Sequence, residues 1–225
     1  TNKEAQEISV TTTDDSKTFV KRLCTITIQK TTPDFATVTT TVAGKEIAGI
    51  VLVTDWYSDC PWHEGDTALA LQLTPGSQPT FSVAHLELLE AVFEGLSPEI
   101  RNGTVRIMGV SRVPGVRAKV AVASIDKNID PIRACVGKSA NRVAAASKYC
   151  NGERIEIVQW SRNIEKYVAA SLAPSEPTSV IIDGEDAVVS VPAHQMSAAV
   201  GRSGLNSQLA GNLVGLRVQV VPQTD

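Results

Sequence analysis

Two segments of the chain share a pattern in which four small or basic residues interrupt an otherwise helical stretch. Residues 133–149 read RACVGKSANRVAAASKY, and residues 197–213 read SAAVGRSGLNSQLAGNL. A helix that stops at glycine and restarts has unpaired N–H groups at its new N-terminus, where the helix dipole is positive. Glycine lets another backbone approach closely, and a basic residue adds charge. This pattern favours the binding of a phosphate backbone.

The two interruptions, residues 137–140 and 201–204, resemble the GXXG loop of KH domains, which holds about four nucleotides of single-stranded nucleic acid. A single such motif can equally be a helix C-cap and a turn, because glycine is common at that position. Two copies at matching places favour binding. We expect contacts from Gly137, Lys138, Ser139, Asn141 and Arg142 in the first copy, and from Gly201, Arg202, Ser203, Gly204 and Asn206 in the second.

Enzyme motifs are incomplete in this chain. Residues 137–139 look like the end of a P-loop, but that motif needs glycine where Ile132 stands. The second interruption looks like a nucleophile elbow, which needs glycine in place of Leu205. No histidine lies in a recognisable catalytic triad, and Cys60 and His63 lack a second pair of metal ligands. We therefore predict a protein that is not an enzyme, with no catalytic residue, metal site or cofactor.

The interruptions belong to a longer internal repeat. Gly137 and Gly201 lie 64 residues apart, and Gly152 and Gly215, which open two apolar segments, lie 63 apart. Such a repeat, joined with almost no linker, indicates two similar units packed together. Each copy reads as helix, strand, strand, helix, interruption, helix and strand. The expected elements are 85–97, 103–110, 117–124, 131–136, a helix to 149 and 152–158, then 162–172, 178–183, 187–191, a helix to 200, a helix to 214 and 215–221.

Upstream of the repeat, residues 18–84 read as five short strands, because Thr, Val and Ile recur in largely alternating segments between turns. The strands are expected at 19–31, 35–44, 46–53, 67–74 and 79–84. Five strands indicate a small barrel, and five is the strand count of an OB-fold. Residues 1–17 are polar with few apolar anchors, so we predict a flexible lead-in there.

The net charge of −3 conceals an uneven distribution. Residues 1–100 contain 6 Lys/Arg and 14 Asp/Glu (−8), residues 101–163 contain 12 and 4 (+8), and residues 164–225 contain 3 and 6 (−3). A basic middle indicates one local surface for a polyanion, although such segments are also often just solvated surface. The candidate phosphate contacts in this segment are Arg112, Arg117, Lys119 and Arg133.

Composition points to compact domains, with 43% hydrophobic and 4% aromatic residues. The longest apolar runs are too short to span a membrane, and no signal peptide is recognisable. We predict a cytoplasmic protein that does not interact with membranes. Its four cysteines, Cys24, Cys60, Cys135 and Cys150, are expected to be reduced and mostly buried.

At these residues the sequence resembles the NusA family of bacterial transcription elongation factors. DPIRACVGKSANRV, GERIEIVQWS, AASLAPS and VSVPAHQMSAAVGRSGLNSQLAGNLVGLRVQV look like that family's tandem KH segment. EIAGIVLV, HEGD and VAHLELLEAVFEGLSPEIRNGTVRIMGVSRVPGVRAKVAV look like its S1-type barrel and the junction beyond it. The resemblance implies a β-barrel plus α+β fold, with a five-stranded OB-fold barrel of S1 type (18–84) followed by two tandem type II KH domains (85–160 and 161–225).

The resemblance also implies partners and a role. The partners are single-stranded RNA of the nascent transcript, RNA polymerase and other elongation or antitermination factors. The role is to modulate pausing, termination and antitermination. The protein is expected to be a monomer. The family's polymerase-binding N-terminal domain has no counterpart in residues 1–17, so we expect a fragment or a shortened protein. The alternative is a mainly protein-binding scaffold on the transcription complex, with weakened RNA binding.

Some residues depart from the family pattern. Ala140 stands where the first loop would have glycine, and Gln208 and Asn212 stand where basic residues are usual. In the barrel, a loop with three aromatic residues could stack on bases, or it could pack onto the barrel, which the negative charge nearby favours. The three residues are Trp56, Tyr57 and Trp62.

Overall fold

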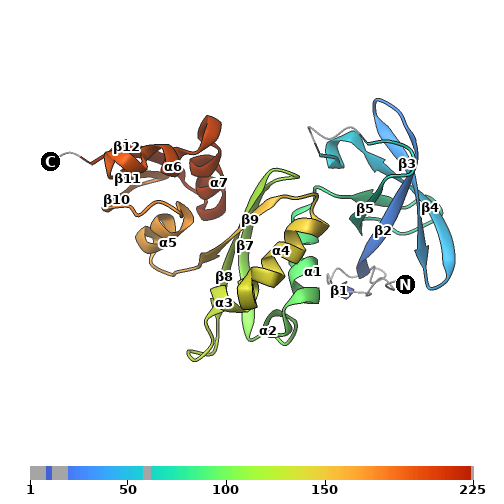
Figure 1. The fold of residues 1–225 in the computed structure, drawn as a ribbon, viewed down its shortest axis with the longest axis horizontal. Helices are drawn as coiled ribbons and strands as arrows, with labels where there is room; N and C mark the ends of the chain where they lie inside the picture. The colour runs from blue at the N-terminus through green and yellow to red at the C-terminus, as the bar shows by residue number, and fades with distance from the viewer. Residues whose placement is uncertain (1–8, 12–19, 58–61, 224–225) are drawn as a thin grey trace.

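The computed structural model describes residues 9–11, 20–57 and 62–223. Three units lie in a row along its long axis, with a barrel at one end and the second repeat unit at the other (Figure 1). The barrel has the strand order β2-β3-β4-β6-β5, and β5 pairs back onto β2, so the sheet closes. The predicted five-stranded OB-type barrel is confirmed. Its strands are β2 (Val20–Thr31), β3 (Phe35–Val42), β4 (Lys45–Leu52), β5 (Thr67–Gln72) and β6 (Thr80–Ser82).

Alternating side chains give the barrel its interior. Ile26 and Ile28 of β2 are buried, whereas Thr25 is exposed, because successive side chains of a strand point to opposite faces. Gly49 of β4 allows β6 to lie close beside it. A Cβ at this position would lie 2.4 Å from the carbonyl oxygen of Pro79, so a larger residue would push the two strands apart.

One further strand is absent from the sequence-based prediction. β1 (Ser9–Thr11) pairs antiparallel with β2, with Val10 opposite Lys21. The sequence-based prediction of a flexible lead-in included no strand at these three residues. The remainder of residues 1–17 lies outside the described part of the chain.

The first repeat unit has the predicted order of helices and strands, with one additional helical turn, α2. Its sheet has the order β7-β8-β9, antiparallel between β7 and β8 and parallel between β8 and β9. Val120 and Val122 of β8 pack with Leu89 of α1 in the core of this unit. The elements are α1 (Leu86–Leu96), α2 (Pro98–Arg101), β7 (Val105–Val113), β8 (Arg117–Ser124), α3 (Pro131–Val136), α4 (Asn141–Tyr149) and β9 (Arg154–Gln159).

The second repeat unit has the same arrangement. Its sheet has the order β10-β11-β12, again antiparallel and then parallel. Val189 of β11 packs with Leu172 and Ala210 in a separate core. The order α-β-β-α-α-β with this mixed sheet is that of a type II KH domain, so the chain is an S1-type barrel followed by two KH domains. The elements are α5 (Ile164–Ser171), β10 (Ser179–Asp183), β11 (Asp186–Val191), α6 (Met196–Val200), α7 (Leu205–Val214) and β12 (Arg217–Pro222).

The predicted burial of the cysteines is confirmed for those that the structure describes. Cys24, Cys135 and Cys150 are buried, and Cys60 lies outside the described residues. Burial raises the pKa of the Cys135 and Cys150 thiols to about 12, so both remain protonated at neutral pH.

A buried ion pair of the first KH domain lies where the barrel packs against that domain. Arg112 Nε lies 2.9 Å from both carboxylate oxygens of Glu153, and neither side chain is exposed. Arg112 Nη1 also donates to the carbonyl oxygen of His85, just before α1. The Gly115 N–H donates to Glu153, and Tyr57 of the barrel packs so closely there that a Cβ on Gly115 would lie 2.9 Å from its ring. The pair thus connects three segments distant in sequence.

The two KH domains meet at the outer face of the first sheet, opposite α1, α3 and α4. Tyr167 of α5 is buried there against Ala121 of β8 and Val158 of β9. Leu213 of α7 packs into the same cluster and accepts a hydrogen bond at its carbonyl oxygen from the Tyr167 hydroxyl at 3.3 Å. The helices of the second domain therefore cover the sheet of the first.

A second buried cation strengthens this interface. The Lys119 side chain is fully buried, and its Nζ donates to Glu156 Oε2 at 2.8 Å and to the carbonyl oxygen of Ala173 at 3.2 Å, beyond α5. Burial lowers the pKa of Lys119, although Glu156 opposes the shift. Because the bond to Ala173 crosses between domains, Lys119 helps to fix their relative position.

The buried Arg112–Glu153 pair and the exposed Arg217–Asp186 pair allow a direct comparison of burial. We expect Glu153→Gln to lower the free energy of unfolding by about 3 kcal/mol, because it leaves the buried Arg112 charge uncompensated. Asp186→Asn removes a bidentate pair whose side chains are 50–73% exposed, and it should change stability little. Urea titration followed by circular dichroism measures both. Equal effects of the two substitutions would contradict the proposed importance of the buried pair.

Candidate nucleic-acid interface

The two helix interruptions have nearly the same backbone conformation. Gly137 ends α3 with φ 78° and ψ 173°, and Gly201 ends α6 with φ 75° and ψ 172°. Ser139 and Ser203 both have φ 52°. Positive φ at three positions in each interruption reverses the chain within four residues, so α4 and α7 begin immediately afterwards. The repeat predicted from the sequence therefore extends to individual dihedral angles.

The first glycine of each loop is needed for packing. A Cβ at Gly137 would lie 2.3 Å from Asn141 Oδ1 and 2.7 Å from Arg142 Cγ. A Cβ at Gly201 would lie 2.7 Å from Asn206 Cβ and 2.8 Å from its backbone nitrogen. These glycines let the helix after each loop pass close to the end of the helix before it. Their first role is therefore to allow this packing.

The fourth position of each loop is different, because it faces open space. Gly204 has φ 78°, and a Cβ there would meet nothing within 4 Å. Ala140 occupies the equivalent place with φ 60°, which is uncommon for a residue with a Cβ. Such a surface leaves the N-terminus of the following helix accessible to an anion. The exposed side chains around it are those of Lys138 and Ser139 in the first loop, and of Arg202 and Ser203 in the second.

Two residues expected to bind RNA brace the interruptions instead. Arg142 Nη1 donates to the carbonyl oxygen of Ala134 and, at 2.8 Å, to Glu99 Oε2. Asn206 is fully buried, and its Nδ2 donates to the carbonyl oxygens of Ala198, Ala199 and Leu172. Ala134 and Ala198 are 64 residues apart, as are the two donors, so the two braces are equivalent. We therefore no longer include Arg142 and Asn206 among the candidate contacts, whereas Asn141 is exposed and stays.

The structure also contradicts the expectation that three basic residues of the middle segment bind phosphate. The side chains of Arg112 and Lys119 have no exposed surface, and Arg117 is 12% exposed and bonded to Glu156 at 2.6 Å. A guanidinium or ammonium without accessible surface cannot reach a phosphate. Arg133 is 90% exposed and lies 3.4 Å from Asp130, so it stays a candidate.

Other exposed cations are absent from our sequence-based set. Lys148, at the end of α4, and Arg162 and Lys166, near the start of α5, are exposed and have no ion pair within the described residues. Local sequence does not distinguish them from the internally paired cations. Only their positions in the folded chain show that their charge is available to a ligand.

The aromatic residues of the barrel pack against one another. The rings of Trp56 and Trp62 lie 5.0 Å apart, and those of Tyr57 and Trp62 lie 6.0 Å apart. Tyr57 is 5% exposed and Trp62 is 9% exposed. This geometry favours the packing alternative over base stacking by all three rings.

No group of three or more His, Cys, Asp or Glu side chains that could hold a metal ion occurs within residues 9–11, 20–57 and 62–223. Across that same part of the chain, no helix is long and apolar enough to cross a membrane.

Comparison with known families identifies these two domains. Residues 83–160 match the model of the NusA-like first KH domain, and residues 164–225 match that of the NusA-like second KH domain. The chain belongs to the NusA family. This confirms the resemblance found in the sequence, and the family models place the two loops within successive KH domains.

Several curated relatives have the name "Transcription termination/antitermination protein NusA". The protein of Bacillus subtilis is 39% identical over 154 residues, which are 68% of this chain and 42% of the relative. The proteins of Halalkalibacterium halodurans and Rickettsia prowazekii are 37% and 38% identical, and the matches cover 40% and 31% of their lengths. The chain thus spans less than half the length of these NusA proteins. Their name refers to transcription termination and antitermination.

Gly204 provides a test of the second NusA-type loop. Gly204→Asp places a side chain and a negative charge where a phosphate would lie. We expect it to weaken RNA binding by about 1–3 kcal/mol, the range for losing a charge-assisted hydrogen bond. The control is Gly215→Asp at the other end of α7, since Gly215 also has positive φ and open space around it. Fluorescence anisotropy with single-stranded RNA measures binding, after circular dichroism shows that both variants are folded. Unchanged affinity of Gly204→Asp would mean that this loop is only a turn.

Ala140 provides the reverse test in the first loop. Ala140→Gly removes a methyl group from the open side of the loop and relieves the left-handed backbone, so we expect RNA affinity to rise about two- to threefold. Ala43→Gly is the matched control, because Ala43 has φ 48° in the β3–β4 turn of the barrel. The same anisotropy titration applies. A rise for both variants, or for neither, would count against direct contact at Ala140.

Proposed function

We propose that this chain binds single-stranded RNA through the loops of its two KH domains and acts in this way on transcription. One observation supports this most strongly: two loops of the same backbone conformation, each with exposed Lys or Arg and Ser at its tip. Such loops clamp an unpaired sugar-phosphate backbone. The retained candidate contacts are Gly137, Lys138, Ser139, Asn141, Arg133, Gly201, Arg202, Ser203 and Gly204.

The interface between the KH domains supports simultaneous use of both loops. Tyr167 and Lys119 fix the second domain on the sheet of the first. A strand held at one loop therefore meets the other at a constant separation, and the second contact forms as an intramolecular event. Two weak clamps in fixed positions bind a continuous strand more tightly than either does alone.

The name of the relatives supports a cellular role. We infer that the bound RNA is the nascent transcript, that RNA polymerase and other elongation or antitermination factors are the protein partners, and that the protein affects pausing, termination and antitermination in the bacterial cytoplasm as a monomer. The names of the relatives refer to termination and antitermination. Pausing comes from the family resemblance.

A protein scaffold with weakened RNA binding is the alternative, and the barrel favours it. Residues 18–100 contain 4 Lys/Arg against 10 Asp/Glu, and the second KH domain has few basic residues. This alternative predicts a dissociation constant no tighter than nonspecific binding, about 10⁻⁴ to 10⁻⁶ M at physiological salt, with little sequence preference. Titration with a pool of single-stranded RNAs distinguishes the two functions.

The dependence of binding on salt tests the role of the loop cations. Lys138→Ala and Arg202→Ala should each reduce the slope of log affinity against log salt by about 0.7, the value for one phosphate contact on a single strand. Lys45→Ala is the control, since Lys45 is exposed on the barrel, in the first residue of β4. Duplex RNA of the same length should bind more weakly than the single strand. Unaltered slopes, or equal affinity for duplex and single strand, would oppose the proposed clamp.

A further inference from the structure

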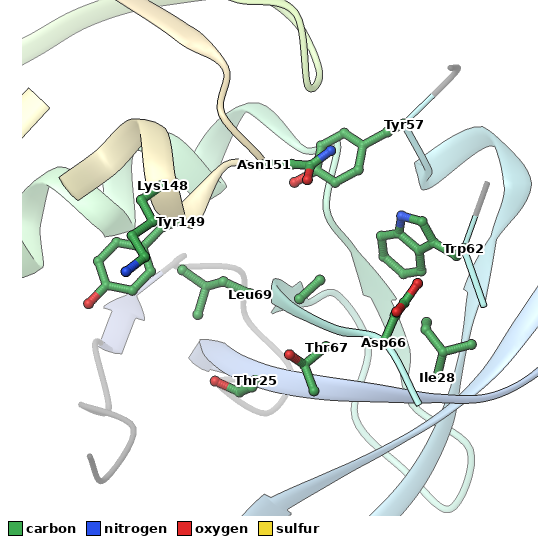
Figure 2. A pocket seen from close by; sticks show the side chains of 11 residues that line it. Thr25, Ile28, Tyr57, Trp62, Asp66, Thr67, Leu69, Lys148, Tyr149 and Asn151 are labelled. Atoms are coloured by element: carbon green, nitrogen blue, oxygen red, sulfur yellow. The ribbon is translucent and has the colours of Figure 1, made fainter. Parts of the chain in front are cut away.

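A cleft of about 580 Å³ lies between the barrel and the end of α4. On the barrel side it is lined by β2 and β5 and by Trp62, and on the KH side by α4 and the turn after it (Figure 2). Its volume is within the range of small-molecule sites. The lining residues used below are Thr25, Asp66, Thr67, Lys148, Tyr149 and Asn151.

Tyr149 is the prominent side chain of this cleft. It is the last residue of α4, and 47% of its surface is exposed, which is high for a large aromatic side chain. Lys148 beside it is exposed and has no ion pair within the described residues. An exposed ring next to an exposed cation is the combination that single-strand-binding proteins use, because the ring stacks on a base and the cation attracts its phosphate.

Polar groups line other parts of the cleft (Figure 2). Thr25 and Thr67 expose hydroxyl-bearing side chains on neighbouring barrel strands, and Asn151 adds an amide from the turn after α4. Asp66 is exposed, and its Oδ2 accepts a hydrogen bond from the His63 N–H at 2.9 Å. Donors and acceptors of this kind can pair with the edges of a base. Leu69 and Ile28 add aliphatic lining to the cleft.

The barrel surface that OB-folds usually use is less suited to RNA. That surface lies on the second and third strands, here β3 and β4. Its outward residues include Thr37, Thr39, Thr41, Glu46 and Ala48, and Lys45, at the start of β4, is the single Lys or Arg in these two strands. The cleft lies instead on β2 and β5, the side facing the first KH domain.

α4 connects the first loop to the cleft. The helix begins at Asn141, directly after the loop, and ends at Tyr149. Nine helical residues span about 13.5 Å. An RNA strand clamped at Lys138 therefore reaches Tyr149 by following one helix.

We propose that this cleft binds one unpaired nucleotide of the RNA strand that the first KH loop holds, with its base stacked on Tyr149 and its phosphate next to Lys148. The inference rests on the proposed RNA binding and adds a third contact point beyond the two loops. In this proposal the barrel forms one wall of the site with β2 and β5. The surface on β3 and β4, which OB-folds normally use, takes no part.

The test compares an unstructured RNA of about 16 nucleotides with an abasic strand of the same length, which keeps the phosphates and lacks the bases. Tyr149→Ala should weaken binding of the ordinary RNA about tenfold, the lower part of the range for one base–aromatic stack, and leave the abasic strand unaffected. Tyr149→Phe should restore the affinity. Lys148→Ala should weaken binding of both strands and reduce the salt slope by about 0.7, whereas Lys45→Ala should do neither.

The outcomes separate this proposal from the proposed function. If Tyr149→Ala binds the ordinary RNA like the unmodified protein while Gly204→Asp binds it poorly, the cleft proposal is overturned and the KH clamp stands. If Tyr149→Ala weakens both strands equally, the ring does not stack on a base and the proposal fails as well. If the unmodified protein binds no RNA beyond nonspecific affinity, both proposals fail. Circular dichroism and thermal melting verify that each variant is folded.

Discussion

The barrel packs against the first KH domain beside the buried pair that Arg112 and Glu153 form within that domain. Removing two charges from water costs several kcal/mol per ion, and only close geometry and further hydrogen bonds offset that cost. Here the Gly115 N–H and the His85 carbonyl provide those bonds. The pair therefore holds the β7–β8 turn, the start of α1 and the start of β9 in one arrangement. Tyr57 of the barrel packs at Gly115 beside this pair and also lines the cleft next to Tyr149.

The order of the elements could be predicted from the sequence, because periodicity and turn residues are local properties. The strands of the barrel and both copies of the KH repeat followed from them. Whether each basic side chain lies on the surface or in a buried ion pair could not be predicted in the same way. The surplus of +8 in residues 101–163 indicated a surface, but Arg112, Arg117 and Lys119 point into interfaces and pair with Glu153 and Glu156. Pairing depends on which strands become neighbours, and that information is not local.

The sequence likewise revealed the part of the candidate site that depends on local backbone conformation, and not the part that depends on which elements become neighbours. Glycines at matching positions of a repeat revealed both loops, because the left-handed backbone restricts the residue type at those positions. Asn206 looked like a contact because it follows a loop, and burial shows it to be a brace. Lys148 and Tyr149 had no signal of their own. The reason to propose a role for them is structural, because the end of α4 and strands β2 and β5 of the barrel line the same cleft.

Four side chains at the critical junctions bond to main-chain carbonyl oxygens. The donors are Arg112, Lys119, Arg142 and Asn206, and the acceptors are the carbonyls of His85, Ala173, Ala134 and Ala199. Every residue type has a carbonyl oxygen, whereas few have a donor of the required length. Homologous proteins can therefore change the residue on the acceptor side without losing the bond, and they have little freedom on the donor side. At these junctions, homologous proteins should therefore retain the donor residue, whereas the residue that provides the carbonyl oxygen should vary.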